Sequence, residues 1–203
     1  MQVYNVKIVD SPDQLDKAEK LYLEQFRDGV PGYEPRTSAQ LVYIKDKGLL
    51  CRMESEETNL RAEVTSFDGD TYTDSCLEFF VNFNPDAGDY YINLEGNPIG
   101  TLHCKYGKDR YERKTLSACG CELKPTAEAQ IFDGGWAICY FIPIELIRII
   151  FKRDSLNHGN ILKANFYKCG DKTEHPHYGM WSLVEREGYD FHSPEFFGRL
   201  ILD

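Results

Sequence analysis

The chain has 203 residues and a mass of 23.4 kDa, with 42% hydrophobic and 28% charged residues, the balance of an ordinary globular protein. This length suits a single domain over residues 1–203, and no run approaches the roughly 20 apolar residues of a transmembrane helix, so we expect no membrane partner. The formal net charge of −10 argues against nucleic acid as a partner, because phosphate binding needs clustered lysine and arginine.

The N-terminal part of the chain contains one helix signal and one hairpin. Ser11 is placed to cap a short helix that has Pro12 at its first position. Residues 41–44 and 49–54 flank a short turn sequence and predict a β-hairpin. Its second arm puts Arg52 on the polar face, where such side chains are usually solvated.

A second hairpin, over residues 74–97, has two faces of opposite chemistry. Its arms alternate between hydrophobic and polar positions, and a turn rich in Asn, Asp, Pro and Gly joins them. Glu78 in the first arm and Asn93 and Glu95 in the second fall on the polar face. One face is expected to pack on a core. The other is either a solvated surface or the floor of a site for a polar ligand.

The remaining signals indicate further strands and one more short helix. Residues 144–151 follow a proline and have the hydrophobic spacing of a short amphipathic helix. Strands about ten residues apart, separated by turn signals, predict an all-β antiparallel sandwich, immunoglobulin-like or jelly-roll-like, with one or two short helices. The other expected strands cover residues 100–106, 117–123, 135–142, 161–169 and 199–202. Residues 20–26 alternate and fit a strand as well as they fit a continuation of the first helix.

The cysteines and the N-terminus bear on the cellular compartment. Seven cysteines are an odd number and are scattered, which is typical of reduced structural thiols. The first residues lack the basic start and apolar core of a secretory signal. We therefore expect a cytoplasmic protein as the sequence stands, or a secreted one if a signal has been removed. Cys119 and Cys121 form a C-x-C pair, which is only a weak metal signal.

Known catalytic motifs are not found. The sequence has no G-x-S-x-G, H-E-x-x-H, P-loop or dinucleotide fingerprint. His175 and His177 alternate around a proline, but no third ligand is evident nearby. Glu78 and Glu95 could face each other across the hairpin, and paired carboxylates can hydrolyse glycosides. A glycoside hydrolase therefore stays open beside a binding protein.

Several motifs together resemble a known family. They occupy residues 74–80, 91–97 with Gly100 and Thr101, 164–171, 177–182 and 191–200. In order, they resemble segments of the carbohydrate-binding module family nine-like domains, over about residue 18 to the C-terminus. The resemblance implies a β-sandwich shared with xylanase-attached modules that grip the ends of glucan and xylan chains. It also implies that calcium can be bound.

The resemblance also bears on the binding residues. Sugar-binding members clasp the ligand between two tryptophan rings, and Trp181 lies in a matching late segment. No tryptophan stands at the early position, where this chain has residues 26–29, and Trp136 is expected in the core. From the residues and the resemblance together, we predict non-catalytic carbohydrate binding. The predicted ligand-binding residues are Arg52, Glu78, Asn93, Glu95 and Trp181.

A third hypothesis follows from the missing tryptophan. Losing one ring of a clasp removes stacking and buried area worth about one or a few kcal/mol. The domain would then bind sugar weakly, or would keep the fold as an interaction module without a sugar.

Overall fold

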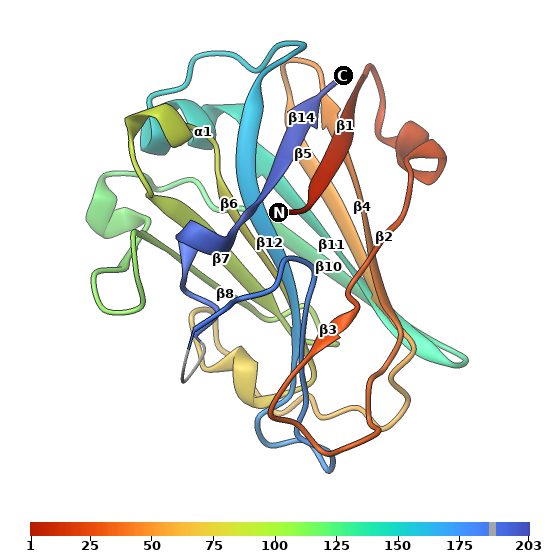
Figure 1. Cartoon of the computed structure of the whole chain (residues 1–203). Helices are drawn as coiled ribbons and strands as arrows, with labels where there is room; N and C mark the ends of the chain where they lie inside the picture. The colour runs from red at the N-terminus through yellow and green to blue at the C-terminus, as the bar shows by residue number, and fades with distance from the viewer. Residues whose placement is uncertain (187–189) are drawn as a thin grey trace.

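The computed structural model describes residues 1–186 and 190–203, and these residues form mainly β-strands (Figure 1). Within this part of the chain the α-helix is α1 (Ile144–Phe151), and short 3₁₀ turns lie in several connections. The strands are β1 (Val3–Val9), β2 (Leu21–Tyr22), β3 (Gln25–Phe26), β4 (Thr37–Ile44), β5 (Gly48–Ser55), β6 (Cys76–Asn82), β7 (Tyr91–Gly96), β8 (Leu102–Gly107), β9 (Lys114–Thr115), β10 (Thr126–Phe132), β11 (Gly135–Pro143), β12 (Ile161–Cys169), β13 (Tyr178–Met180) and β14 (Gly198–Leu202).

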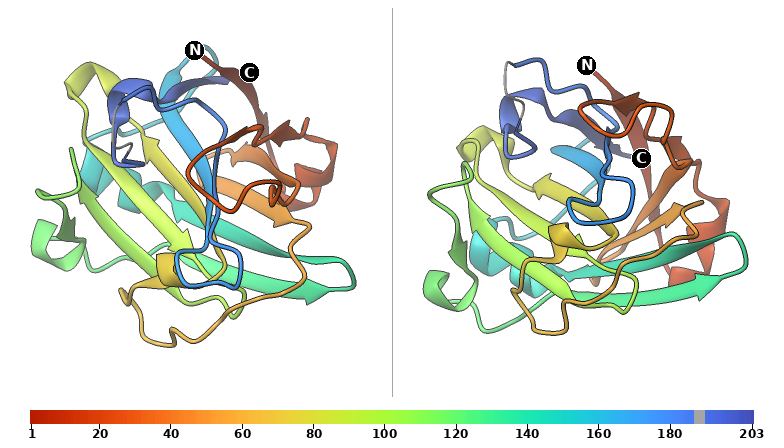
Figure 2. Two further views of the ribbon diagram at one scale, coloured as in Figure 1. Left: turned by 60° about the horizontal axis from the view of Figure 1, so that its bottom comes forward. Right: turned by 90° about the horizontal axis from the view of Figure 1, so that it is seen from below.

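The strands follow one hydrogen-bonded path that curls into two facing layers (Figure 2). The order along the path is β10-β11-β5-β4-β1-β14-β12-β6-β7-β8-β9. The layer on one side of β1 contains β4, β5, β11 and β10, and the other contains β14, β12 and β6 to β9. The predicted all-β, sandwich-like fold is confirmed.

Strand β1 belongs to both layers and joins them. Residues 3–6 run parallel to β14, and residues 7–9 run parallel to β4. The other pairings among the described strands are antiparallel. The prediction of antiparallel pairing is therefore wrong at β1. Parallel neighbours need a long connection, and almost the whole chain lies between β1 and β14.

The main hydrophobic core lies between the layers. Leu77 and Phe79 of β6 point into it and share one buried cluster with Ile138 and Tyr140 of β11. The Tyr140 hydroxyl donates a hydrogen bond of 2.6 Å to the Leu77 carbonyl oxygen. A Cβ at Gly96 would collide with the side chains of Ile138 and Tyr140. A glycine at this position therefore lets β7 approach the opposite layer closely.

The polar face of the β6–β7 hairpin is also buried. Phe80 belongs to a second hydrophobic cluster, together with Tyr91, Tyr167 and Phe197, that the C-terminal loops cover. Glu78 and Glu95 on the same face are almost fully buried. Loops and turns from distant parts of the sequence thus cover this face. The sequence predicted the alternation of the two faces, but it left open whether the polar face is solvated.

Other local predictions have mixed outcomes. The helix over residues 144–151 and the strand over residues 161–169 are confirmed. The strand expected over residues 117–123 is wrong: Ser117–Cys119 form a 3₁₀ turn, which ends at Gly120 with φ 78°. No helix in the described part of the chain has both the length and the apolar character needed to cross a membrane.

Candidate functional site

A polar pocket of about 310 Å³ lies over β6, β7, β8 and β12, on the face that points away from the main core. Directly paired residues of neighbouring strands share a face of the sheet. Glu78 pairs with Glu95, and Glu95 pairs with His103, so all three side chains reach the pocket floor. Cys169 of β12 completes the floor. A 3₁₀ turn before β6, the loop after β8 and the loop before β14 supply the walls.

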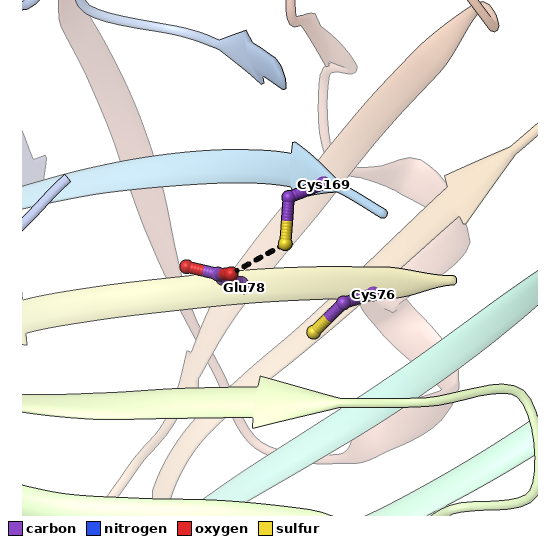
Figure 3. A group of neighbouring side chains, drawn as sticks. All are labelled: Cys76, Glu78 and Cys169. Atoms are coloured by element: carbon purple, nitrogen blue, oxygen red, sulfur yellow. Dashed lines mark hydrogen bonds between the residues drawn. The ribbon is translucent and has the colours of Figure 1, made fainter. Parts of the chain in front are cut away.

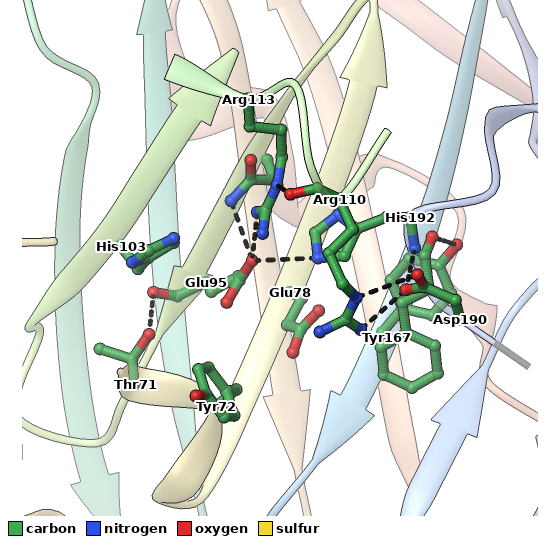
Figure 4. A network of polar contacts seen from close by, with 12 residues as sticks. Thr71, Tyr72, Glu78, Glu95, His103, Arg110, Arg113, Tyr167, Asp190 and His192 are labelled. Carbon is green, nitrogen blue, oxygen red and sulfur yellow. Dashed lines mark hydrogen bonds and ion pairs between the residues drawn. The ribbon is translucent and has the colours of Figure 1, made fainter. Parts of the chain in front are cut away.

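Glu95 is held in place by several donors (Figure 4). Asn93 Nδ2 donates a hydrogen bond of 2.9 Å to Glu95 Oε1, and Arg113 Nη1 lies 3.4 Å from the same oxygen. Thr71 Oγ1 donates to the Glu95 backbone carbonyl at 2.9 Å. The carboxylate is therefore oriented and partly neutralised before any ligand arrives.

Glu78 lies in a different electrostatic environment. Burial and the neighbouring Glu95 carboxylate raise the pKa of the Glu78 carboxyl well above its usual range, although Arg113 acts in the opposite direction. The Cys169 thiol donates to Glu78 Oε1 at 2.9 Å. The floor thus holds two carboxyl groups in unequal settings, because Glu95 has close cationic and amide partners and Glu78 faces a thiol.

One wall is an arginine–carboxylate pair. Arg110 Nε and Nη2 donate to the two oxygens of Asp190 at 2.9 and 2.7 Å. Burial alone would raise the pKa of Asp190, but the Arg110 hydrogen bond and the backbone N–H of His192 hold it below its usual range. This bidentate pair fixes the guanidinium plane at the pocket edge.

His192 joins the floor to the wall. Its Nδ1 lies 2.9 Å from the Tyr91 hydroxyl, and its Nε2 lies 4.0 Å from Glu95 Oε1. Burial, followed by the charges of Arg113 and Arg110, lowers the pKa of His192 well below its usual value. The ring is therefore neutral at pH 7 and can both donate and accept hydrogen bonds.

Aromatic side chains line the same pocket. Tyr72 is 37% exposed, and Tyr178 and Phe191 also contribute to the lining. The Tyr178 hydroxyl is hydrogen-bonded to Asp171. The Phe191 ring stacks on Tyr167 with 4.0 Å between centroids. The pocket combines flat apolar rings with carboxyl, guanidinium and imidazole groups, and such a set can hold a small, hydroxyl-rich molecule.

Comparison with known families identifies the domain. A family model described as carbohydrate-binding family 9 matches residues 11–202, nearly the whole chain. The chain belongs to this family. The resemblance seen in the motifs is thereby confirmed.

Solved structures resemble this family 9 domain over its full length. A putative carbohydrate-binding protein from Bacteroides uniformis is 26% identical, with a TM-score of 0.82 over 100% of this chain and 99% of that one. A family 9 module from Caldicellulosiruptor kristjanssonii in complex with cellotriose has 12% identity and a TM-score of 0.71 over 99% and 93% of the two chains. The complex of such a module with glucose has 12% identity and a TM-score of 0.69, over 100% and 96%. No curated protein sequence matches the chain significantly.

The family 9 fold brings together three of the five predicted binding residues. Glu78 and Glu95 reach the pocket, and Asn93 lies buried beneath it as a hydrogen-bond donor to Glu95. Arg52 lies on β5 in the other layer, where its Nη2 is 3.2 Å from Glu54 Oε2. A direct role of Arg52 in the same pocket therefore has no structural support.

Trp181 also lies apart from the polar pocket. It is 5% exposed, belongs to the main core and packs edge-on against Phe166. A Cβ at Gly198 would collide with the Trp181 ring. Its role as a sugar platform stays a prediction, and its packing is that of a core residue. Trp136 is fully buried, as expected.

Several pocket residues were missed from the sequence because they come from loops. Tyr72 precedes the hairpin, and Arg110 and Arg113 lie in the loop after β8. His192 stands in one of the family motifs, but nothing in its neighbours indicated contact with Glu95. In a chain with a net charge of −10, the two arginines of the loop after β8 were the sequence signal that could have indicated a polar site there.

Calcium, which the family resemblance implied, fits the described residues poorly. Calcium takes six to eight oxygen ligands. The carboxylate of Asp74, the most deeply buried aspartate, faces donors and a cation: its Oδ2 accepts hydrogen bonds from the Glu63 and Val64 backbones and from Asn97, and its Oδ1 lies 3.4 Å from Arg61 Nε. The compact group of potential metal ligands in the described chain contains two sulfurs. We therefore assign no calcium ligands.

Proposed function

We propose that this family 9 domain binds carbohydrate without catalysis, in the pocket over β6, β7, β8 and β12. The observation that carries the proposal is the meeting of Tyr72 with the Glu95–Arg113 and Arg110–Asp190 pairs at one small cavity. Sugars present apolar C–H faces to rings and paired hydroxyls to charged planar groups. The pocket offers both kinds of partner.

The size of the pocket favours a short ligand. A volume of about 310 Å³ stands at the lower end of small-molecule sites, which begin near 300 Å³. We propose one or two sugar units, or the end of a longer glucan or xylan chain. The glucose and cellotriose complexes of related modules support this ligand class. A role beside enzymes of polysaccharide degradation would follow from such binding.

Hydrolysis by Glu78 and Glu95 is the competing hypothesis, and the register argues against it. The two residues are direct partners on adjacent strands, so both carboxyl groups rise from the same floor. Glycosidases instead place their carboxyl groups on either side of the scissile bond. In addition, Glu95 already accepts from Asn93 and Arg113.

Calorimetric titration with glucose, cellobiose, xylobiose and galactose tests the proposal. We expect saturable binding of at least one sugar, without release of shorter products in chromatography of the same samples. Arg110→Ala should weaken binding about tenfold or more, because it removes one charged wall. Arg36→Ala is the matched control, since Arg36 also pairs with a surface carboxylate, Glu56, but lies outside the pocket.

Three outcomes would count against the proposal. If the folded protein binds none of the four sugars, the interaction-module hypothesis replaces it. If Arg110→Ala and Arg36→Ala weaken binding equally, the site lies elsewhere. Turnover of cellobiose or xylobiose that is lost in Glu78→Gln would favour the hydrolase.

A further inference from the structure

Cys76, Glu78 and Cys169 form a compact cluster on β6 and β12 (Figure 3). Glu78 and Cys169 belong to the pocket lining. The two sulfurs and one carboxylate oxygen all lie within 4.8 Å of one another. Cys169 Sγ donates to Glu78 Oε1 at 2.9 Å, and all three residues are buried. Among residues 1–186 and 190–203, no other group of three histidine, cysteine or carboxylate side chains brings its ligand atoms this close together.

The sheet register sets this geometry. Cys76 and Cys169 are direct partners on antiparallel β6 and β12, so their side chains point to the same face. Glu78 follows Cys76 by two positions on β6 and therefore shares that face. The three ligand atoms are thus fixed by backbone hydrogen bonds of two central strands and not by loops. Sites on such elements hold their geometry well.

We propose that Cys76, Glu78 and Cys169 bind one thiophilic divalent ion of the zinc class. Tetrahedral zinc takes Cys sulfur at about 2.3 Å and carboxylate oxygen at about 2.0–2.2 Å, which places two sulfur ligands about 3.8 Å apart. The present separations of up to 4.8 Å need only small side-chain rotations to reach these values. The set of two sulfurs and one oxygen favours zinc, cadmium or cobalt over calcium and magnesium.

The pocket gives the ion an entry path and an open coordination position. Glu78 and Cys169 line the pocket, and Cys76 is buried beside them. Three protein ligands leave the fourth tetrahedral position for a water molecule or another oxygen on the pocket side. Binding replaces the thiol and carboxyl protons by the charge of the ion, so affinity should increase with pH.

The proposal does not depend on carbohydrate binding. Its test is metal titration without sugar, so failure here leaves the carbohydrate proposal intact, and the reverse also holds. The C-x-C pair supplies an internal comparison. Cys119 is partly exposed and lies on the 3₁₀ turn after β9, and it does not belong to the cluster.

The experiment titrates the folded, fully reduced chain with Co²⁺ and Cd²⁺, with Ca²⁺ as a comparison. We expect one Co²⁺ with a tetrahedral visible spectrum, one Cd²⁺ with a thiolate charge-transfer band, and protection of two thiols from alkylation. Cys76→Ser and Cys169→Ser should abolish the spectra. Glu78→Gln removes a direct ligand and should weaken binding at least as much as the loss of an outer-shell partner does, by about tenfold to a hundredfold or more. Cys119→Ser should bind as the wild type does.

The proposal is overturned if the folded, reduced wild type binds neither ion stoichiometrically. It is also overturned if the spectra persist in Cys169→Ser. Disappearance of the spectra in Cys119→Ser would likewise overturn it, because the ion would then be bound by the C-x-C pair. Because the wild-type titration and Glu78→Gln need no cysteine substitution, the test stands even if a serine variant does not fold.

Discussion

Lys168 Nζ lies 2.9 Å from Glu57 Oε2 inside the protein, and neither side chain is exposed. Trp136 Nε1 donates to the same oxygen at 3.2 Å, and Ser75 Oγ donates to the other oxygen at 3.0 Å. Lys168 Nζ also donates to the Cys169 carbonyl at 2.9 Å. The two charges are therefore paired and hydrogen-bonded, which is the condition under which buried ions persist.

Removing one member of this pair should be costly. Lys168→Met leaves the Glu57 carboxylate buried without its cation, and we expect the free energy of unfolding to fall by about 3–5 kcal/mol. Urea unfolding followed by circular dichroism measures the change. The double variant Lys168→Met with Glu57→Gln removes both charges and should recover part of the loss. A double variant that loses as much as the sum of the singles would contradict this account.

His177, beside the Lys168–Glu57 pair, should make the stability of the protein decrease in acid. Burial, followed by the charge of Lys168, lowers the pKa of His177 from 6.5 to about 4, against the opposing effects of the His175 carbonyl and of Glu57, whose Oε1 lies 3.8 Å away. Tyr33 packs edge-on against the ring. The folded protein therefore holds this imidazole neutral at pH values where the unfolded chain protonates it.

The sign of the pH dependence follows from these two values. Above about pH 6.5 the His177 contribution is complete, and it is lost as pH falls towards 4, because only the unfolded state takes up the proton. The loss should be on the order of 3 kcal/mol. His177→Gln should flatten this part of the stability profile, measured by urea unfolding between pH 4 and 7. His158→Gln is the control, because it makes the same substitution at a histidine whose side chain is 78% exposed and not buried.

The local pattern of the sequence predicted the hairpin but not its surroundings. Alternation in residues 74–97 identified Glu78, Asn93 and Glu95 as one face, since the strand period of two is a local property. What covers that face is set by loops distant in sequence, such as the one that carries His192. Contacts such as that of Arg113 with Glu95 therefore had no local signature. The sequence could predict the floor of the pocket but not its walls.

Trp181 is the binding residue that the family motif predicted and whose packing is that of a core residue. The ring fills space between Phe166 and Gly198, and space filling by a side chain cannot be read from a single sequence. We expect Trp181→Ala to lower the free energy of unfolding by about 3–5 kcal/mol through the cavity it leaves. Sugar binding by the remaining folded protein should change less than twofold. Loss of binding without loss of stability would instead restore Trp181 as a platform.

Tyr72 is the aromatic residue whose removal should weaken sugar binding. It is 37% exposed and lines the pocket from the turn Thr71–Thr73, while the backbone of that turn is anchored by the Thr71 hydrogen bond to Glu95. Truncation should therefore remove a ring face without moving the floor. We expect Tyr72→Ala to weaken sugar binding by about 1 kcal/mol or more, roughly fivefold to tenfold, with little change in stability.

Tyr22 provides the matched control for this measurement. Its side chain is equally exposed, at 37%, but it lies on β2 in the other layer, beneath the Arg36 guanidinium. Calorimetric titration of both alanine variants should show weaker binding only for Tyr72→Ala. Equal effects would mean that the loss comes from a general change in the fold. If Tyr22→Ala alone weakens binding, the sugar site lies on the other layer, and the pocket over β6 and β7 is then free for the metal ion alone.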